Sequence, residues 1–203
     1  MHKNQHGSDA TEEIRKIIST QTLSSISFDD AVAKTYFFHK VASILQLPTI
    51  YLDFDVLYSG YVVSGMLQKS DDVELLQPTP EAMSDMTVAV LERISLQKHL
   101  VIIDSLNGLF TMLNEKDAGR LVNSMIMMLT SAGQKTGSHV LVGSISKFRQ
   151  NDGWTLTALG RKVIDVDRMN ILSVKKQDSQ FQMSVLDRNN LQKSTVLFDL
   201  DLI

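Results

Sequence analysis

The chain has 203 residues, 43% of them hydrophobic and 21% charged, and a formal net charge of −3. This composition is typical of one globular domain that is long enough to bury a core. The absence of cysteine excludes disulfides, thiol nucleophiles and cysteine-ligated metals. No apolar run approaches the roughly 18–20 residues that span a bilayer, and the polar N-terminus contains no secretory signal. We therefore predict a cytoplasmic protein with no membrane segment.

Apolar runs and helical spacings alternate along the first part of the chain. After an expected flexible segment at residues 1–8, a single domain is predicted over residues 9–203, beginning with a short helix capped near Asp9. Short apolar runs, each followed by apolar residues at helical spacing, indicate parallel strands joined by helices. The predicted strands are 23–27, 49–55, 73–77, 100–104 and 138–144, and the predicted helices between them are 34–47, 56–67, 81–97 and 115–135.

The pattern changes after residue 160. Three β-rich segments joined by short polar turns follow, at residues 168–175, 180–186 and 195–200. Such segments indicate antiparallel strands at one edge of the sheet. The predicted fold class is therefore α/β: a mostly parallel sheet with helices on both faces and a C-terminal antiparallel β extension.

The strand predicted at 100–104 reads Leu-Val-Ile-Ile-Asp and ends in a single carboxylate, Asp104. Buried parallel strands deliver such residues to the carboxyl edge of the sheet, where nucleotide-hydrolysing α/β proteins hold Mg²⁺. Asp104 is therefore a candidate Mg²⁺ ligand, provided that a nucleotide binds. The alternative is that Asp104 caps the turn beginning at Ser105.

The segment from Phe28 to Thr35, Phe-Asp-Asp-Ala-Val-Ala-Lys-Thr, has the length and the Lys-Thr ending of the phosphate-binding loop G-x-x-x-x-G-K-[ST]. Phe28 and Ala33 stand at its two glycine positions. The glycines of a working loop permit the turn and the close approach of backbone N–H groups to phosphate. The sequence therefore predicts a degenerate loop, in which Lys34 and Thr35 are the remaining candidate nucleotide-binding residues.

Charge adds a second obstacle to phosphate binding. Asp29 and Asp30 would lie near the phosphates, and like charges about 4 Å apart repel by roughly 4 kcal/mol at an effective dielectric of about 20. Without a phosphate, Lys34 could pair with Asp29, Asp30 or Asp104 and fill the site with an internal salt bridge. We therefore expect no bound cofactor, and weak or unconventional binding of ATP with Mg²⁺ is the alternative.

In this order, the segments resemble the RecA-type ATPase core of archaeal and eukaryotic strand-exchange recombinases, their short RadB-like paralogues and KaiC-like proteins. The resemblance covers roughly residues 20–200. It implies that residues 49–55 are the second strand, ending in an acidic residue that activates the attacking water. Asp55 stands there in place of a longer glutamate, so a capping role is the alternative. Ser144, at the tip of its strand, would sense a γ-phosphate or bond the adjacent backbone.

The resemblance also places residues 148–154 near a DNA-binding loop. Residues 145–193 hold nine basic and five acidic side chains, a charge of +4, so the remainder of the chain carries −7. A basic face can bind nucleic acid or an acidic partner, and the alternative is a solvated hairpin rim. The candidate nucleic-acid-binding or partner-binding residues are Lys147, Arg149, Trp154, Arg161 and Lys162.

Two functions are compatible with these features. The favoured hypothesis is a non-catalytic accessory or regulatory subunit in DNA recombination or repair. Its partner would be a recombinase-like or RecA-fold protein or a second copy of the chain, with DNA as a further candidate. The alternative is a KaiC-like or RadB-like nucleotide-binding switch or weak ATPase in signalling or repair. Retention of Lys34, Thr35 and Asp104 motivates this alternative.

Overall fold

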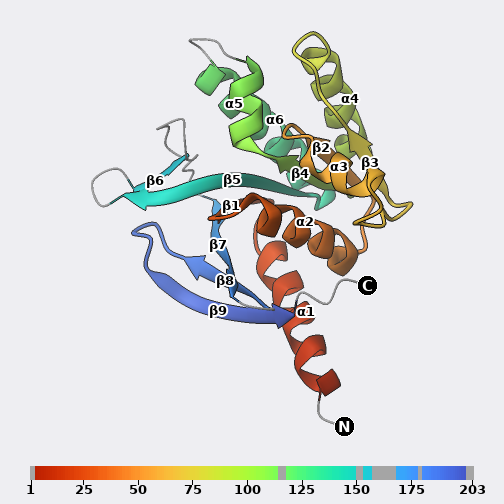
Figure 1. Cartoon of the computed structure of the whole chain (residues 1–203). Helices are drawn as coiled ribbons and strands as arrows, with labels where there is room; N and C mark the ends of the chain where they lie inside the picture. Colours follow the sequence, from red (N-terminus) through yellow and green to blue (C-terminus); the bar gives the residue numbers. More distant parts are fainter. Residues whose placement is uncertain (1–2, 114–117, 150–152, 157–167, 178–179, 200–203) are drawn as a thin grey trace.

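A computed structural model describes residues 3–113, 118–149, 153–156, 168–177 and 180–199, and places nine strands in one sheet with helices on both faces (Figure 1). The strands are β1 (Leu23–Phe28), β2 (Thr49–Asp53), β3 (Val73–Leu76), β4 (Leu100–Asp104), β5 (His139–Arg149), β6 (Gly153–Leu156), β7 (Met169–Gln177), β8 (Gln180–Leu186) and β9 (Gln192–Asp199). The helices are α1 (Lys3–Ser19), α2 (Ala31–Leu45), α3 (Leu57–Val63), α4 (Met83–Leu96), α5 (Leu106–Leu113) and α6 (Ala118–Thr136).

The strand order is β3-β2-β4-β5-β1-β7-β8-β9, with β6 hydrogen-bonded to β5. The strands from β3 to β7 along this path are parallel, whereas β8 and β9 are antiparallel. This arrangement confirms the predicted fold class. Because β4 and β5 separate β1 from β2, the carboxyl ends of these strands enclose the position where open α/β sheets bind ligands. Within the described residues, no helix is both long and apolar enough to cross a bilayer.

Two hydrophobic cores explain why the central strands are almost continuously apolar. In β4, Leu100 and Ile102 point into the core that contains α1 and α2, while Val101 and Ile103 point into the core that contains α4, α5 and α6. Alternate residues of a strand face opposite sides of the sheet, so a strand covered on both sides needs apolar residues at every position. The predicted layers are therefore present.

Several element boundaries differ from the predictions. Helix α1 begins at Lys3, before the predicted cap at Asp9, and the side chains of Ala10, Ile14 and Ile18 are buried along one face. Helix α5 follows β4 directly, where a turn was predicted. Strand β5 continues to Arg149 and pairs with β6, so the described residues between 148 and 154 belong to a hairpin and not to a loop. Pairing satisfies their backbone groups, which a loop would leave to solvent.

Candidate functional site

The turn between β1 and α2 does not have the shape of an open phosphate loop. Strand β1 ends at Phe28 and α2 begins at Ala31, so only two residues connect them. Asp30 caps the helix: its carboxylate accepts the backbone N–H of Ala33 at 2.7 Å, and its carbonyl accepts the N–H of Lys34 at 3.1 Å. These backbone donors at the start of α2 therefore already have partners.

The residues at the two altered glycine positions belong to the core. Phe28 is 1% exposed, and its ring lies edge-on to Phe37 and Phe38 at centroid distances of 5.5 and 5.4 Å. Ala33 is buried as well. Thr35 is fully buried, and its hydroxyl donates to the Ala31 carbonyl at 3.1 Å. The departures from the loop motif are thus packing residues of β1 and α2.

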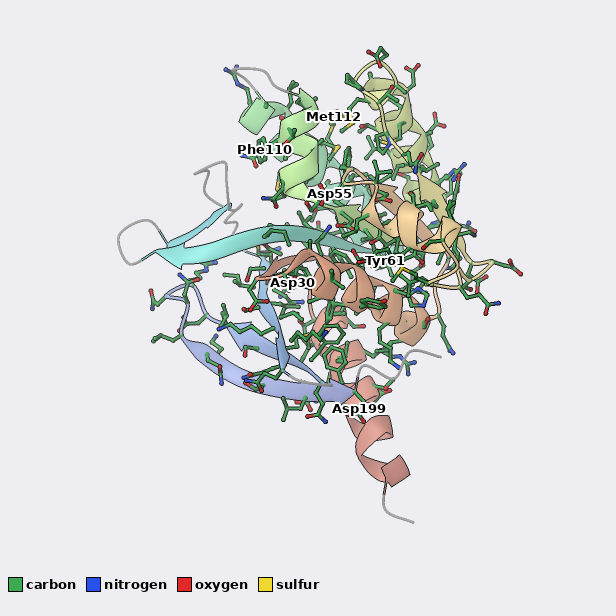
Figure 2. The ribbon with its side chains drawn as sticks, viewed as in Figure 1. Asp30, Asp55, Tyr61, Phe110, Met112 and Asp199 are labelled. Atoms are coloured by element: carbon green, nitrogen blue, oxygen red, sulfur yellow. The ribbon has the colours of Figure 1, made fainter. Side chains whose placement is uncertain are left out.

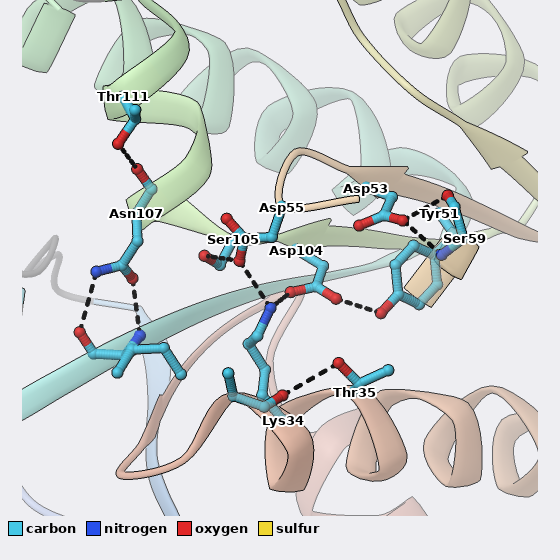
Figure 3. A network of polar contacts seen from close by, with 12 residues as sticks. Lys34, Thr35, Tyr51, Asp53, Asp55, Ser59, Asp104, Ser105, Asn107 and Thr111 are labelled. Atoms are coloured by element: carbon cyan, nitrogen blue, oxygen red, sulfur yellow. Dashed lines mark hydrogen bonds and ion pairs between the residues drawn. The ribbon is translucent and has the colours of Figure 1, made fainter. Parts of the chain in front are cut away.

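Lys34 lies at the centre of a buried ionic cluster (Figure 3). Its ammonium donates to Asp104 Oδ1 and, at 2.9 Å, to Asp55 Oδ2. The side chains of Lys34 and Asp104 are fully buried, while that of Asp55 is 24% exposed. Burial lowers the pKa of Lys34, and the charges of Asp55 and Asp53 oppose this shift. Lys34 therefore makes one of the three pairings that the sequence predicted, together with an unpredicted one to Asp55.

Tyr51 takes the second oxygen of Asp104. The phenol is fully buried and donates to Asp104 Oδ2 at 2.5 Å. Burial and the charge of Asp53 raise the pKa of Tyr51 well above its usual value, so the hydroxyl stays protonated. The ring stacks on Tyr58 at 4.2 Å, and the Tyr58 hydroxyl lies 3.2 Å from His39 Nδ1. Both carboxylate oxygens of Asp104 are consequently engaged by protein donors.

Asp53, at the end of β2, and Asp55, just beyond it, have different partners. The capping carboxylate after β2 is Asp53, not Asp55: Asp53 Oδ2 accepts the backbone N–H and the hydroxyl of Ser59 at 2.7 and 2.5 Å. Asp55 instead binds Lys34 and accepts the Ser105 hydroxyl at 2.7 Å. Asp104 does not cap the following segment, because its oxygens face Lys34 and Tyr51. Figure 2 shows Asp30 at the start of α2 and Asp55 near the base of α5.

Ser144 is fully buried in β5, and its hydroxyl donates to Ser146 Oγ at 3.4 Å. Beside it, the side-chain amide of Asn107 accepts the N–H of Ile145 at 2.8 Å and donates to its carbonyl at 3.1 Å. The Asn107 amide thus supplies the hydrogen bonds that a neighbouring strand would give to the Ile145 backbone, at a point where β4 has already ended. No motif in the sequence points to Asn107, although a polar side chain just beyond a buried strand is a usable signal.

The basic and aromatic candidates lie apart from this cluster. Lys147 and Arg149 are in β5 and Trp154 is in β6, where the backbone register pairs Trp154 with Phe148. Arg161 and Lys162 lie outside the described residues. Among the described residues, no group of three or more histidine and acidic side chains could hold a metal ion. The role of Asp104 as a Mg²⁺ ligand therefore stays a prediction.

Comparison with solved structures identifies the fold. The crystal structure of the RadB recombinase matches with a TM-score of 0.60 at 14% sequence identity, covering 88% of this chain and 86% of that chain. A second solved structure, an ATPase domain, also matches with a TM-score of 0.60, at 12% identity over 93% of this chain and 85% of that chain. No family model and no curated protein matches the sequence. These likenesses, together with the sheet order, show that the chain has the RecA-like α/β fold.

Proposed function

We propose that this chain is a RecA-fold protein without nucleotide chemistry of its own, which acts as an accessory or regulatory subunit in DNA recombination or repair. The observation that carries the proposal is the pairing of Lys34 with Asp104 and Asp55. In the phosphate-loop motif this lysine reaches the nucleotide phosphates. Here its ammonium is already bonded to two carboxylates.

The surrounding groups do not fit a nucleotide phosphate or its Mg²⁺. Helix N-termini bind anions through free backbone N–H groups, and the Asp30 carboxylate already occupies that position on α2. The Thr35 hydroxyl donates to backbone, and both oxygens of Asp104 accept hydrogen bonds. A bound phosphate would therefore have to displace two carboxylates while lying close to both.

The cost of opening this cluster argues against binding at ordinary nucleotide concentrations. Leaving a buried charge without its partner costs roughly 3–5 kcal/mol. That free energy corresponds to a loss of about two to four powers of ten in affinity. In the proposed accessory role, a partner supplies the ATP chemistry and this chain supplies a binding surface.

Isothermal titration with ATP and with ADP, both in Mg²⁺, tests the nucleotide part of the proposal. We expect no saturable heat and no shift of the thermal midpoint at millimolar nucleotide. The variant Lys34→Ala should unfold at a lower temperature than the wild type, by the same amount with and without nucleotide. Saturable binding at micromolar concentration would contradict the proposal.

The second candidate function is a RadB-like or KaiC-like nucleotide switch. Retention of Lys34, Thr35 and Asp104, and the structural likeness to RadB recombinase, favour it. Under this alternative, nucleotide would stabilise the wild type against heat, and Lys34→Ala would abolish that stabilisation. The same two titrations therefore separate the two functions.

DNA binding through the β5–β6 hairpin is the part of the proposal that concerns a partner. The hairpin carries Lys147 and Arg149 in β5 and Trp154 in β6, and surfaces that bind single strands combine basic and aromatic residues. We expect an oligonucleotide to bind with an affinity that falls steeply as salt rises. The double variant Lys147→Glu/Arg149→Glu should weaken binding, whereas Arg120→Glu/Lys135→Glu, a double reversal of exposed residues in α6, should leave it nearly unchanged. Binding that does not depend on salt, or no binding at all, would exclude DNA as the partner, and a protein would then be the remaining candidate partner.

A further inference from the structure

Strand β9 forms one edge of the sheet, and no described strand pairs with its outer side. Figure 1 shows β9 along the rim of the molecule, with α1 crossing its C-terminal end. The inner face of β9 is anchored, because Val196 and Phe198 are buried in the same core as residues of α1. The outer backbone groups of an edge strand are a template for another chain.

The central part of β9 lacks the features that usually protect an edge. Residues 194–198 read Ser-Thr-Val-Leu-Phe, with no charge, proline or glycine, and Thr195, Val196 and Phe198 favour β structure. The register against β8 is regular here; the one irregularity lies beside Lys193, just before this run. Leu197 is 52% exposed, although it is a large apolar residue. This stretch is therefore a regular, apolar and accessible pairing surface.

We propose that β9 pairs antiparallel with β9 of a second copy of this chain, centred on Val196. In that register, Thr195 of each copy lies opposite Leu197 of the other, which covers the exposed leucine. Lys193, which the β-bulge leaves without a partner in β8, precedes this run, and Asp199 ends it, so the antiparallel arrangement brings a cation and an anion together at each end of the contact. Among the described residues, Lys193 forms no salt bridge, and Asp199 uses only Oδ1, which accepts from Gln180 at 2.8 Å. Figure 2 labels Asp199 at this end of β9.

A second copy is the occupant that the charges favour. A strand with a cation at its start and an anion at its end is complementary to itself only when the two copies run antiparallel. Such a contact is isologous and closes as a dimer, whereas a head-to-tail contact would extend into a filament. The dimer would form whether or not the site around Lys34 binds nucleotide.

Light scattering after size-exclusion chromatography measures the mass directly. We expect about twice the chain mass of 22.7 kDa at a protein concentration of about 100 µM. A mass of one chain at this concentration would overturn the proposal. Because the contact is small, the dimer should dissociate on dilution.

Two matched double variants test the register. Thr195→Lys/Leu197→Lys places like charges opposite each other twice, and should weaken dimerisation by roughly tenfold or more. Thr195→Glu/Leu197→Lys places opposite charges there twice, and should keep the dimer. Both alter only side chains on the outer face, and circular dichroism verifies that they fold. Equal dimerisation of the two variants, or a monomer in both, would overturn the proposed pairing.

Discussion

Lys34 and Asp104 are 70 positions apart in the sequence, yet they form an ion pair in which neither side chain is exposed. The pair joins the start of α2 to the end of β4, and Tyr51 in β2 and Asp55 just after β2 extend it. A buried pair of this kind contributes less to stability than its contacts suggest, because both charges lose their hydration. Removing either residue alone leaves the other as a buried charge without its partner, which destabilises the folded state.

The first prediction concerns that dependence. Lys34→Met leaves Asp104 buried with Tyr51 as its remaining partner, and should lower the free energy of unfolding by about 3–5 kcal/mol. The double variant Lys34→Met/Asp104→Leu removes both charges and should recover a large part of this loss. Urea unfolding of both variants measures the difference. Simple additivity, with the double variant worse than Lys34→Met, would show that the pair is not coupled.

The layers of the fold could be predicted because the signal repeats along the chain. Residues 100–103 are apolar at every position since both faces of β4 are covered, and the helices between strands show their own period. The short elements could not be predicted from the sequence. Helix α5 contains Gly108 in its first turn, which is typical of a turn in the sequence, and β6 has four residues that pair with β5 alone among the described strands. Such elements depend on tertiary partners and carry little local signal.

The candidate site was predictable in its residue types but not in its pairings. Lys34 and Asp104 were singled out by motif, and their pairing was one of three options. Tyr51 was missed because its role depends on the register that pairs Asp53 with Asp104 across β2 and β4. Strand β2 is buried at every position, so its hydrophobic pattern does not distinguish one register from the next, and the division of capping and ion-pairing between Asp53 and Asp55 could not be predicted.

A second prediction follows from the backbone at Val56. This residue has φ 60° and ψ 10°, a left-handed conformation that is unfavourable for a β-branched side chain. The strain costs about 1–2 kcal/mol, whereas glycine loses about 0.5–1 kcal/mol through its greater freedom when unfolded. Val56→Gly should therefore raise the free energy of unfolding by up to about 1 kcal/mol.

The control for Val56→Gly lies in the helix that follows it. Val63 is 87% exposed and has no positive φ, so Val63→Gly should lower stability by about 0.2–0.5 kcal/mol. Thermal unfolding of the two variants gives the comparison. Destabilisation by both would show that the left-handed conformation at Val56 carries no strain.

A third prediction concerns Gly108, which packs against the segment that holds Asp55. A Cβ added at Gly108 would lie 2.8 Å from the carbonyl carbon and oxygen of Phe54 and would also collide with the Asp55 carboxylate. Backbone atoms cannot yield as a flexible side chain can. Gly108→Ala should therefore destabilise the protein by more than about 2 kcal/mol, in spite of the higher helix propensity of alanine.

Gly60 provides the contrast, because a Cβ there meets nothing within 4 Å. Gly60 lies in α3, so Gly60→Ala should stabilise the protein by up to about 1 kcal/mol. Chemical denaturation of the two alanine variants should show opposite signs. Stabilisation by both would mean that propensity, and not the approach of α5 to Phe54, decides the outcome.

The last prediction is a loss of stability in mild acid. Burial and the charge of Lys98 lower the pKa of His139 from 6.5, and a hydrogen bond with the Gln21 backbone opposes this shift. Burial and the charge of Lys40 lower the pKa of His39 from the same value. Between the lowered values and 6.5 the unfolded chain binds more protons than the folded one, so stability rises with pH in this window. The stabilisation is complete above 6.5 and is lost as the pH falls below it. Urea unfolding between about pH 5.5 and 7.5 should therefore give a free energy of unfolding that decreases as the pH falls. His39→Gln/His139→Gln should flatten this slope, and an unchanged slope would assign the acid sensitivity to other groups.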